Sequence, residues 1–478
     1  MSHYLCASAR ATTLPPRKAG RVELKERTMQ KPYVPRLAIA AMLALGVGWS
    51  QQARAIPAFS RQTQEPCTSC HIGAFGPELT GRGRTFKLLG YTEQAGDGPS
   101  WWEHFSGMVL GSFTHTAAGT PQAKPSAHSG ANDNFALDQA SLFYGGRIYD
   151  HIGAFIQLTE DGINRRFHVD NVDIRYARQQ DVLGVDTILG ISANNNPGVA
   201  DPYHTLPAWG QPFVASALAP SPIAGAILNG GLAGQVYGAS AYARVGGMVY
   251  AEAGIYNSLS RDVAHYGGLD PNALQLANPA TFWRVALQQE TNRRLFEVGA
   301  FAMNAALRQP GSGADRFLDW GMDASFQFLG NRTHMFTGYG RWLHEDQTLN
   351  GTFGGGNSAN LRNHLSELRG NVSYWYQQTY GVTGGIFRTT GSADAILYQA
   401  SPVGGSVAGR PNTQGYMAEL DWVPFGKPDS YLSPWANLKL GLQYTAFSRF
   451  NGAGQNYDGF GRNASNNNTL YLFAWVAF

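Results

Sequence analysis

The run Cys67-Thr68-Ser69-Cys70-His71 has the residue types and the spacing that attach a c-type haem. Two thiols separated by two residues can each form a thioether with one haem vinyl group, and the next residue then offers an imidazole to the iron. Cys67 and Cys70 would hold the porphyrin, and His71 would be the proximal ligand. A zinc site would need more Cys or His residues nearby, and a thioredoxin-like redox pair would need alternating strands and helices. Because neither context is present, the motif predicts one covalent haem c.

A six-coordinate haem iron needs a second axial ligand from outside this segment. Between residues 56 and 103 the sequence has no His except His71, and it has no Met. We expect Met108 or His104 to be the distal ligand, because both follow the segment closely. The alternatives that stay open are His115, His151, His168, a Met of a later strand, and the amino terminus left after processing.

Residues 29–55 have the features of a secretory signal. A charged start precedes an apolar run over residues 37–49, and Ala53-Arg54-Ala55 is a cleavage site of the A-x-A type. The apolar run is too short to cross a membrane as a helix. Residues 1–28 are polar and basic and contain the third cysteine, Cys6, so we expect an extended or non-native amino terminus. The exported chain would then keep only the two thiols of the haem motif, which suits an oxidising compartment.

The rest of the sequence has the composition of a chain of strands and turns. Charged residues make up 14 % of the chain, Gly residues number 58 and the net charge is +3, so nothing points to nucleic acid. Between residues 106 and 478, about sixteen stretches alternate apolar and polar residues with a period of two. The alternation is clearest in residues 171–176, 318–328, 416–422 and 437–446. Each stretch therefore has one apolar face and one polar or charged face.

The links between these stretches distinguish a membrane barrel from a soluble sandwich, which would show the same alternation. Tight turns are expected at residues 149–151, 245–247, 290–294, 330–333 and 377–379. Long polar links are expected near 117–135, 195–234, 258–281, 347–363, 391–414 and 451–468. Transmembrane barrels have short turns at one end and long loops at the other, and strands of about ten residues match a tilted crossing. We therefore predict an all-β fold, a transmembrane antiparallel β-barrel of about 16 strands over residues 104–478.

Aromatic residues and the chain end fit the same fold. The last stretch is amphipathic and ends in Phe478, which resembles the ending of bacterial outer-membrane proteins. Aromatic girdles at the two membrane interfaces are expected to include Trp320, Tyr339, Trp342, Tyr374 and Trp422.

Residues 56–103 are predicted to be a monohaem cytochrome segment that forms a short plug in the barrel lumen. A segment of this size rarely folds alone, whereas a barrel of about sixteen strands has a wide lumen. Four cations of the segment are candidates for pairing with the haem propionates or with the lumen wall: Arg61, Arg82, Arg84 and Lys87. The proline-rich link at 195–234 is expected either to enter the lumen as a constriction or to cap the outside.

The residues around the motif resemble a known family. The segment Ile56-Pro57-Ala58-Phe59-Ser60-Arg61-Gln62-Thr63 precedes the haem motif, and residues 77–91, PELTGRGRTFKLLGY, follow it. This resembles the fused monohaem cytochrome–porins of the bacterial outer membrane, of which the iron oxidases of iron-oxidising bacteria are best known. Ser60 replaces the usual Ala, and Gly81-Arg82-Gly83-Arg84 replaces the usual F-G-R.

The resemblance implies electron transfer across the outer membrane of a Gram-negative bacterium. Extracellular Fe(II), or another donor, would give one electron to the haem, and a periplasmic cytochrome or copper protein would receive it. The chain would then be an Fe(II) oxidase that acts by outer-sphere electron transfer and is surrounded by outer-membrane lipid, with no catalytic acid–base residues. The alternatives are a porin in which the haem segment is structural, and a conduit for another redox partner. Glu160-Asp161 and Glu345-Asp346 are candidate carboxylate pairs for iron, or ordinary loop charges.

Overall fold

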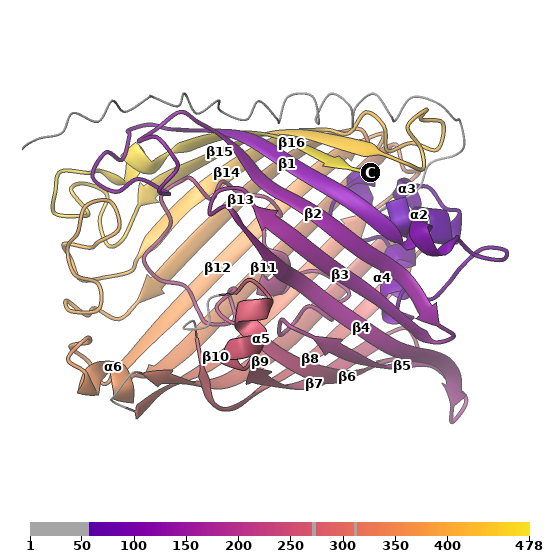
Figure 1. The fold of residues 1–478 in the computed structure, drawn as a ribbon, viewed down its shortest axis with the longest axis horizontal. Coiled ribbons are helices and arrows are strands. Elements are labelled where there is room, and N and C mark those ends of the chain that lie inside the picture. The colour runs from indigo at the N-terminus through magenta and orange to yellow at the C-terminus, as the bar shows by residue number, and fades with distance from the viewer. Residues whose placement is uncertain (1–56, 270–273, 310–312) are drawn as a thin grey trace, which may run out of the picture. The chain divides into compact units, whose positions relative to one another are not determined.

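The computed structural model describes residues 57–269, 274–309 and 313–478. The expected signal segment, residues 29–55, and residues 1–28 lie outside the described residues. In the described residues, sixteen strands form one closed antiparallel barrel, in which each strand pairs with its neighbours in sequence and β1 pairs with β16 (Figure 1). This confirms the predicted fold class.

The strands are β1 (Phe105–Thr116), β2 (Asn134–Tyr149), β3 (Ile152–Asp161), β4 (Arg166–Val182), β5 (Val185–Asn194), β6 (Val236–Val245), β7 (Val249–Ser258), β8 (Leu276–Thr291), β9 (Arg294–Gln309), β10 (Gly313–Phe328), β11 (His334–Thr348), β12 (Arg362–Tyr376), β13 (Tyr380–Gly391), β14 (Thr413–Trp422), β15 (Asn437–Arg449) and β16 (Thr469–Ala477). Short helices precede the barrel or lie in its links: α2 (Pro57–Thr63), α3 (Cys67–Cys70), η1 (Ile72–Ala74), α4 (Gly81–Leu88), η2 (Trp101–His104), η3 (Pro207–Trp209), α5 (Arg261–Tyr266), α6 (Asn350–Gly354) and η4 (Ala464–Asn467). Among the described residues, no helix combines the length and the apolar character needed to cross a bilayer.

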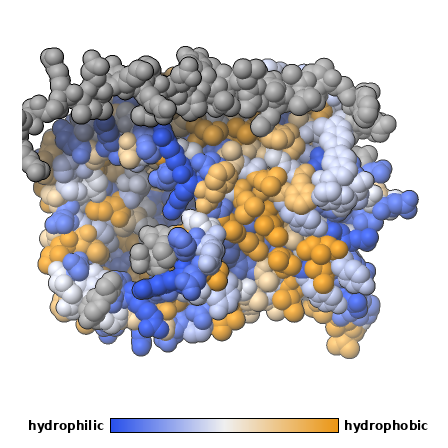
Figure 2. All heavy atoms as spheres, in the orientation of Figure 1, coloured by the Kyte–Doolittle hydropathy of each residue, from blue (hydrophilic) through white to orange (hydrophobic). Residues whose placement is uncertain are grey.

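Alternation along each strand separates a polar interior from an apolar outer surface. In β10, Asp319 and Asp323 are buried in the interior, whereas Trp320 and Met322 are 42 % and 60 % exposed on the outside. Figure 2 shows hydrophobic residues gathered over the middle of the barrel wall, with hydrophilic residues toward the ends. The predicted two-residue period is therefore confirmed, with the apolar face outward.

One expected girdle residue, Tyr339, is on the wrong face for that role. Trp320 and Trp422 are exposed on the outer surface as expected. Tyr339 is buried in the lumen, and its hydroxyl donates to Glu78 Oε1 at 2.8 Å. Side chains alternate along β11, and even-numbered residues such as Phe336 point outward. The odd-numbered Tyr339 therefore points into the lumen.

The long links gather at one end of the barrel, and the other end carries mostly short ones. The short-link end carries the two- and three-residue links 150–151, 183–184, 246–248, 292–293 and 377–379. The long links between β1 and β2, β5 and β6, β7 and β8, β11 and β12, β13 and β14, and β15 and β16 match the six predicted ones. We call their end the long-link end.

One link breaks this rule, because residues 423–436 form a long link at the short-link end. This link packs against the segment that carries the haem motif. A Cβ added to Gly426 would lie only 2.3 Å from the Cβ of Ala74. Asn437, the residue after the link, donates from Nδ2 to the carbonyl of Ala74 at 2.8 Å. The extra length therefore covers this segment.

Residues 57–104, which we call the plug segment, pack against inward-facing strand residues. Tyr91 donates its hydroxyl to Asp173 Oδ2 at 2.7 Å, and Tyr242 donates its hydroxyl to the carbonyl of Leu88 at 2.7 Å. In Figure 1, α2, α3 and α4 gather toward the end of the barrel where β1 begins, and α6 lies at the opposite end. The plug segment therefore occupies the lumen near the short-link end.

Residues 195–235, which we call the inner loop, fold into the lumen from the long-link end. Three inward carboxylates hold the loop by its backbone: Ala226 N donates to Glu367 Oε1 at 2.8 Å, Ile227 N to Glu345 Oε2 at 2.6 Å, and Leu228 N to Asp319 Oδ2 at 2.8 Å. Of the two arrangements expected for this link, the structure has the constriction inside the lumen.

Candidate functional site: a lumen cavity at the Cys-x-x-Cys-His motif

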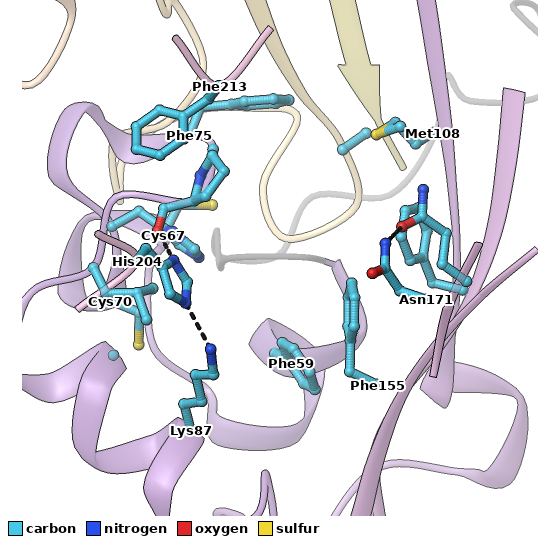
Figure 3. A pocket seen from close by; sticks show the side chains of 18 of the residues that line it. Phe59, Cys67, Cys70, Phe75, Lys87, Met108, Phe155, Asn171, His204 and Phe213 are labelled. Atoms are coloured by element: carbon cyan, nitrogen blue, oxygen red, sulfur yellow. Dashed lines mark hydrogen bonds between the residues drawn. The ribbon is translucent and has the colours of Figure 1, made fainter. Parts of the chain in front are cut away.

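The motif opens onto a cavity of about 360 Å³ enclosed by the plug segment, the inner loop and the barrel wall. This volume lies within the range of roughly 300–1,000 Å³ that is typical of cofactor and ligand sites. Its apolar lining comes from all three parts and includes Phe59, Phe75, Phe86, Phe143, Phe155, Trp209 and Phe213. Figure 3 shows Cys67, Cys70 and His204 on one side of this space, and Met108 and Asn171 on the other.

Helix α3 brings the two cysteines and the histidine together. The four residues Cys67–Cys70 form a single helical turn, and both cysteines are buried and line the cavity. His71 leaves the helix in an extended conformation, and its backbone N–H donates to the carbonyl of Cys67 at 2.8 Å. The Nδ1 atom of His71 is enclosed by protein, so the ring presents its other edge to the cavity that it lines.

Helix α4 holds the motif from behind. The hydroxyl of Thr80, the N-cap of α4, donates to the carbonyl of Ser69 at 2.5 Å, and the Thr80 backbone N–H donates to the carbonyl of Cys70 at 2.9 Å. A Cβ on Gly83 would lie 2.4 Å from the carbonyl oxygen of Cys70. Only glycine permits this close approach. Gly83, which belongs to the Gly-Arg-Gly-Arg run that replaces the usual F-G-R, therefore has a packing role.

Burial sets the protonation states of the motif. It raises the pKa of Cys67 to about 12 and the pKa of Cys70 to about 12, and it lowers the pKa of His71 to about 4. At neutral pH both thiols are protonated and the imidazole is neutral. A reactive dithiol pair needs lowered thiol pKa values, whereas a neutral imidazole is the form that binds a metal ion. The local chemistry therefore fits a haem attachment site better than a redox pair.

The structure separates the two expected distal ligands. Met108 is an inward residue of β1, is buried and lines the cavity. His104 does not line it, and its ring instead stacks on Tyr144 with a centroid separation of 5.5 Å. His115, His151 and His168 do not line the cavity either, and His115 is paired to Asp133 at 2.6 Å. The processed amino terminus lies outside the described residues.

His204 of the inner loop lines the cavity, and the sequence reasoning missed it. Its Nδ1 atom is hydrogen bonded to the carbonyl of Pro77, and its Nε2 atom lies 2.8 Å from Lys87 Nζ. Its ring stacks on Trp209 at a centroid separation of 3.5 Å. Both ring nitrogens therefore have protein partners. A lone His in a proline-rich link carries no periodicity, so nothing local marks it as a lumen residue.

The four cations proposed for haem propionates all have protein partners. Arg84 pairs with Glu290 of β8, and Arg82 pairs with Glu65 and Glu93 within the plug segment. Arg61 Nε donates to the carbonyl of Glu103 at 3.0 Å. Lys87 Nζ donates to the inner-loop carbonyls of Val199 and Asp201 at 2.8 and 2.7 Å. Arg84 and Lys87 therefore join the plug segment to the residues that surround it in the lumen: Arg84 to the barrel wall, and Lys87 to the inner loop.

Neither candidate carboxylate pair forms an iron site. Alternation splits Glu345 from Asp346, because Glu345 points into the lumen while the side chain of Asp346 is 60 % exposed. Asp161 accepts the backbone N–H groups of Ile163 and Asn164 at 3.0 and 2.9 Å, which closes its own turn. In the part of the chain that the structure describes, no group of three or more His, Cys, Asp or Glu residues could hold a metal ion.

Comparisons with known proteins give no family. No family model and no curated protein matches the chain. Among solved structures, the outer membrane channel DcaP of Acinetobacter baumannii is 11 % identical over 78 % of this chain and 96 % of its own, with a TM-score of 0.44. OprB of Pseudomonas putida is 9 % identical over 78 % and 94 %, with a TM-score of 0.43. OmpT of Vibrio cholerae is 9 % identical over 78 % and 96 %, with a TM-score of 0.40. Because these identities and TM-scores are low, the description of the barrel rests on the strand pairing of this chain alone.

Proposed function

We propose that this chain is an electron conduit of a bacterial outer membrane. It takes electrons from an extracellular donor, Fe(II), through one covalent c-type haem and passes them to a periplasmic cytochrome or copper protein. The observation that carries the proposal is the placement of Cys67, Cys70 and His71 on the wall of a cavity inside a closed barrel.

The outer surface supports a membrane location. Outward positions of the strands are occupied by large apolar side chains, among them Ile191, Val298, Met322, Val372 and Leu420, each more than half exposed. In water such a surface would be costly, whereas in a bilayer it faces lipid. By the rule of bacterial outer-membrane barrels, the short-link end faces the periplasm and the long-link end faces the outside.

Each residue of the site has a role in holding the haem. Cys67 and Cys70 would supply the two thioethers, His71 the proximal ligand and Met108 the distal one. The aromatic lining surrounds the site with apolar side chains. A haem c bound there supplies one-electron redox chemistry, with a potential set by its axial ligands and its burial.

The position of the plug segment suggests which partner approaches from which side. The motif lies toward the short-link end, where the turn residue Arg332 donates from Nη1 to the carbonyl of Thr68 at 2.9 Å. The periplasmic carrier would therefore approach this end. The extracellular donor would enter past the inner loop from the long-link end.

The proposal is tested with the full chain produced alongside c-type haem maturation enzymes and purified in detergent. We expect one thioether-linked haem per chain by the pyridine haemochrome assay, and reduction of its spectrum on anoxic addition of Fe(II). Cys67→Ser with Cys70→Ser should abolish covalent haem, and Ser69→Ala, which keeps both thiols and the imidazole of the motif, is the matched control. A chain that stays free of haem under these conditions, or a bound haem that Fe(II) does not reduce, would overturn it.

A second candidate is a solute channel, and the strand count favours it. Barrels of sixteen strands enclose lumens wide enough for an aqueous channel. Conductance across a planar bilayer separates the two functions. Steady conductance of porin size, together with a haem that no external donor reduces, would support the channel. Weak conductance with a reducible haem would support the conduit.

A further inference from the structure

A group of four polar residues, which we call the polar wall, faces the haem motif across the cavity. It consists of Gln139 of β2, Gln157 of β3, and Asp170 and Asn171 of β4, all of which line the cavity. Figure 3 shows Asn171 on the side of the cavity opposite Cys67 and Cys70. The wall interrupts a lining that is otherwise mostly apolar.

A β-bulge turns Asp170 into the lumen. Regular alternation would send Asp170 and Asn171 to opposite faces of β4. The pairing with β3 instead passes from Asn171 directly to Val169, so that Asp170 is an extra residue and both side chains reach the cavity. A second register shift, between β1 and β2, adjoins Gln139. Bulges often re-aim side chains at functional sites.

The amide donor of Gln139 is used within the wall. Its Nε2 lies 3.0 Å from Ser141 Oγ, 3.2 Å from Thr159 Oγ1 and 3.2 Å from Asp170 Oδ2. A carboxylate can only accept hydrogen bonds, so Asp170 fixes the amino group of Gln139 on its own side. The Gln139 carbonyl oxygen is left as the free end of the amide.

The amino groups of the other two amides also donate to protein acceptors. Asn171 Nδ2 donates to Gln157 Oε1 at 2.9 Å, and Gln157 Nε2 donates to hydroxyl oxygens of β2 and β3 at 3.2 Å. Among the described residues, no hydrogen bond reaches Gln139 Oε1, Asp170 Oδ1 or Asn171 Oδ1. The polar wall therefore presents free acceptor oxygens, whereas its amide N–H groups donate to other protein residues.

Asp170 also lacks a cationic partner, which two other inward carboxylates have. Asp173 pairs with Arg175 at 2.8 Å, and Asp323 pairs with Arg284 at 2.7 Å. Within the described ranges Asp170 makes no ion pair, and its hydrogen bonds come from Thr159 and Gln139. Its negative charge is uncompensated at the cavity surface.

We propose that the polar wall docks a hydrated divalent metal cation as the electron donor. Free oxygen acceptors and one uncompensated negative charge suit a hard cation that keeps its water ligands. Too few charged ligands are present to strip and chelate the ion, so it can leave after reaction. The inference rests on the proposed function. The docked cation would give up one electron to a haem held by Cys67, Cys70 and His71 and would depart as a trication, with no bond to the protein formed or broken.

Reduction kinetics of the ferric holoprotein test this site. For Asp170→Asn we expect the second-order rate constant with Fe(II) to fall about 3- to 30-fold, because an attraction between opposite charges is lost. Reduction by neutral hydroquinone should not change, and reduction by anionic dithionite should be unchanged or faster. Asp346→Asn, which changes an exposed outward carboxylate, is the matched control.

Two further measurements complete the test. Asp170→Glu, which keeps the negative charge, should hold the rate constant with Fe(II) within about threefold of the wild-type value. Binding of redox-inert Mn²⁺, counted by electron paramagnetic resonance of the free ion, should weaken in Asp170→Asn. Equal losses with all three reductants would mean a structural role and would overturn the inference, as would an unchanged rate with Fe(II). A chain without haem would overturn the proposed function instead.

Discussion

At the scale of single residues, burial rather than residue type alone decides what the haem motif can do. The two thiols and the imidazole are kept neutral because the plug segment and the barrel exclude water from them. Met108 adds a thioether to the same cavity, and the donors of His204 and Lys87 are already engaged. Met108 is therefore the soft ligand still available on the cavity wall.

Replacing Met108 tests its assignment as the distal ligand. Met108→Ala should abolish the sulfur-to-iron charge-transfer band of the ferric holoprotein, and Met108→His should lower the midpoint potential, because a methionine ligand raises it relative to histidine. Optical spectra and a redox titration measure the two effects. His104→Ala is the control and should leave both unchanged. A wild-type spectrum in Met108→Ala would rule out this ligand.

At the scale of elements, the plug segment and the inner loop stabilise each other in the lumen. Lys87 of α4 donates to two inner-loop carbonyls and to His204, and its ammonium lies 4.0 Å from the ring centre of Trp209. The inner loop also packs apolar side chains, among them Leu206, Leu228 and Leu232, against strand residues of the barrel wall. The cavity between the plug segment and the inner loop depends on their contact.

Removing the Lys87 ammonium should loosen the contact between α4 and the inner loop. Lys87→Met leaves buried carbonyls of Val199 and Asp201 without a donor, at a cost of about 1–3 kcal/mol. We expect a lower thermal unfolding midpoint in detergent, followed by circular dichroism. Lys124→Met, at an exposed loop position, should have no effect. Equal midpoints for the Lys87 variant and the wild type would show that the two segments are held by other contacts.

At the scale of the whole molecule, the apolar outer surface determines where the barrel can reside. An arginine near the middle of a strand would face the bilayer centre, whereas one in a short link would reach water. Met322→Arg should therefore destabilise the folded barrel by about 2–4 kcal/mol in lipid, measured by urea unfolding. Met248→Arg, at a similarly exposed position in the β6–β7 link, should cost far less. Equal costs would argue against a bilayer around β10.

The sequence predicted those features that depend on local patterns. Alternation with a period of two is local to each strand, and it identified the sixteen-strand barrel. The Cys-x-x-Cys-His spacing likewise lies within one helical turn. The orientation of Tyr339 was wrong because an aromatic residue alone does not reveal which face of a strand it occupies. Asp170 was not singled out, because a bulge follows from packing between strands rather than from composition.

Features that depend on tertiary contact were beyond the reach of these patterns. The inner loop could have capped the outside, and its place in the lumen follows from tertiary contacts such as those with Glu345, Glu367 and Asp319. His204 reaches the cavity through that fold. The long link 423–436 covers the plug segment at an end where short turns were expected.

The most direct test of the central claim uses the holoprotein reconstituted in liposomes that enclose a soluble cytochrome c. Hydrated Fe(II), which its charge keeps from crossing the bilayer, is added outside, and reduction of the enclosed cytochrome is followed by its absorbance. The proposed conduit predicts reduction inside only with holoprotein, and none with the Cys67→Ser, Cys70→Ser double variant. An enclosed cytochrome that stays oxidised, although the haem of the barrel itself becomes reduced, would contradict electron transfer across the barrel.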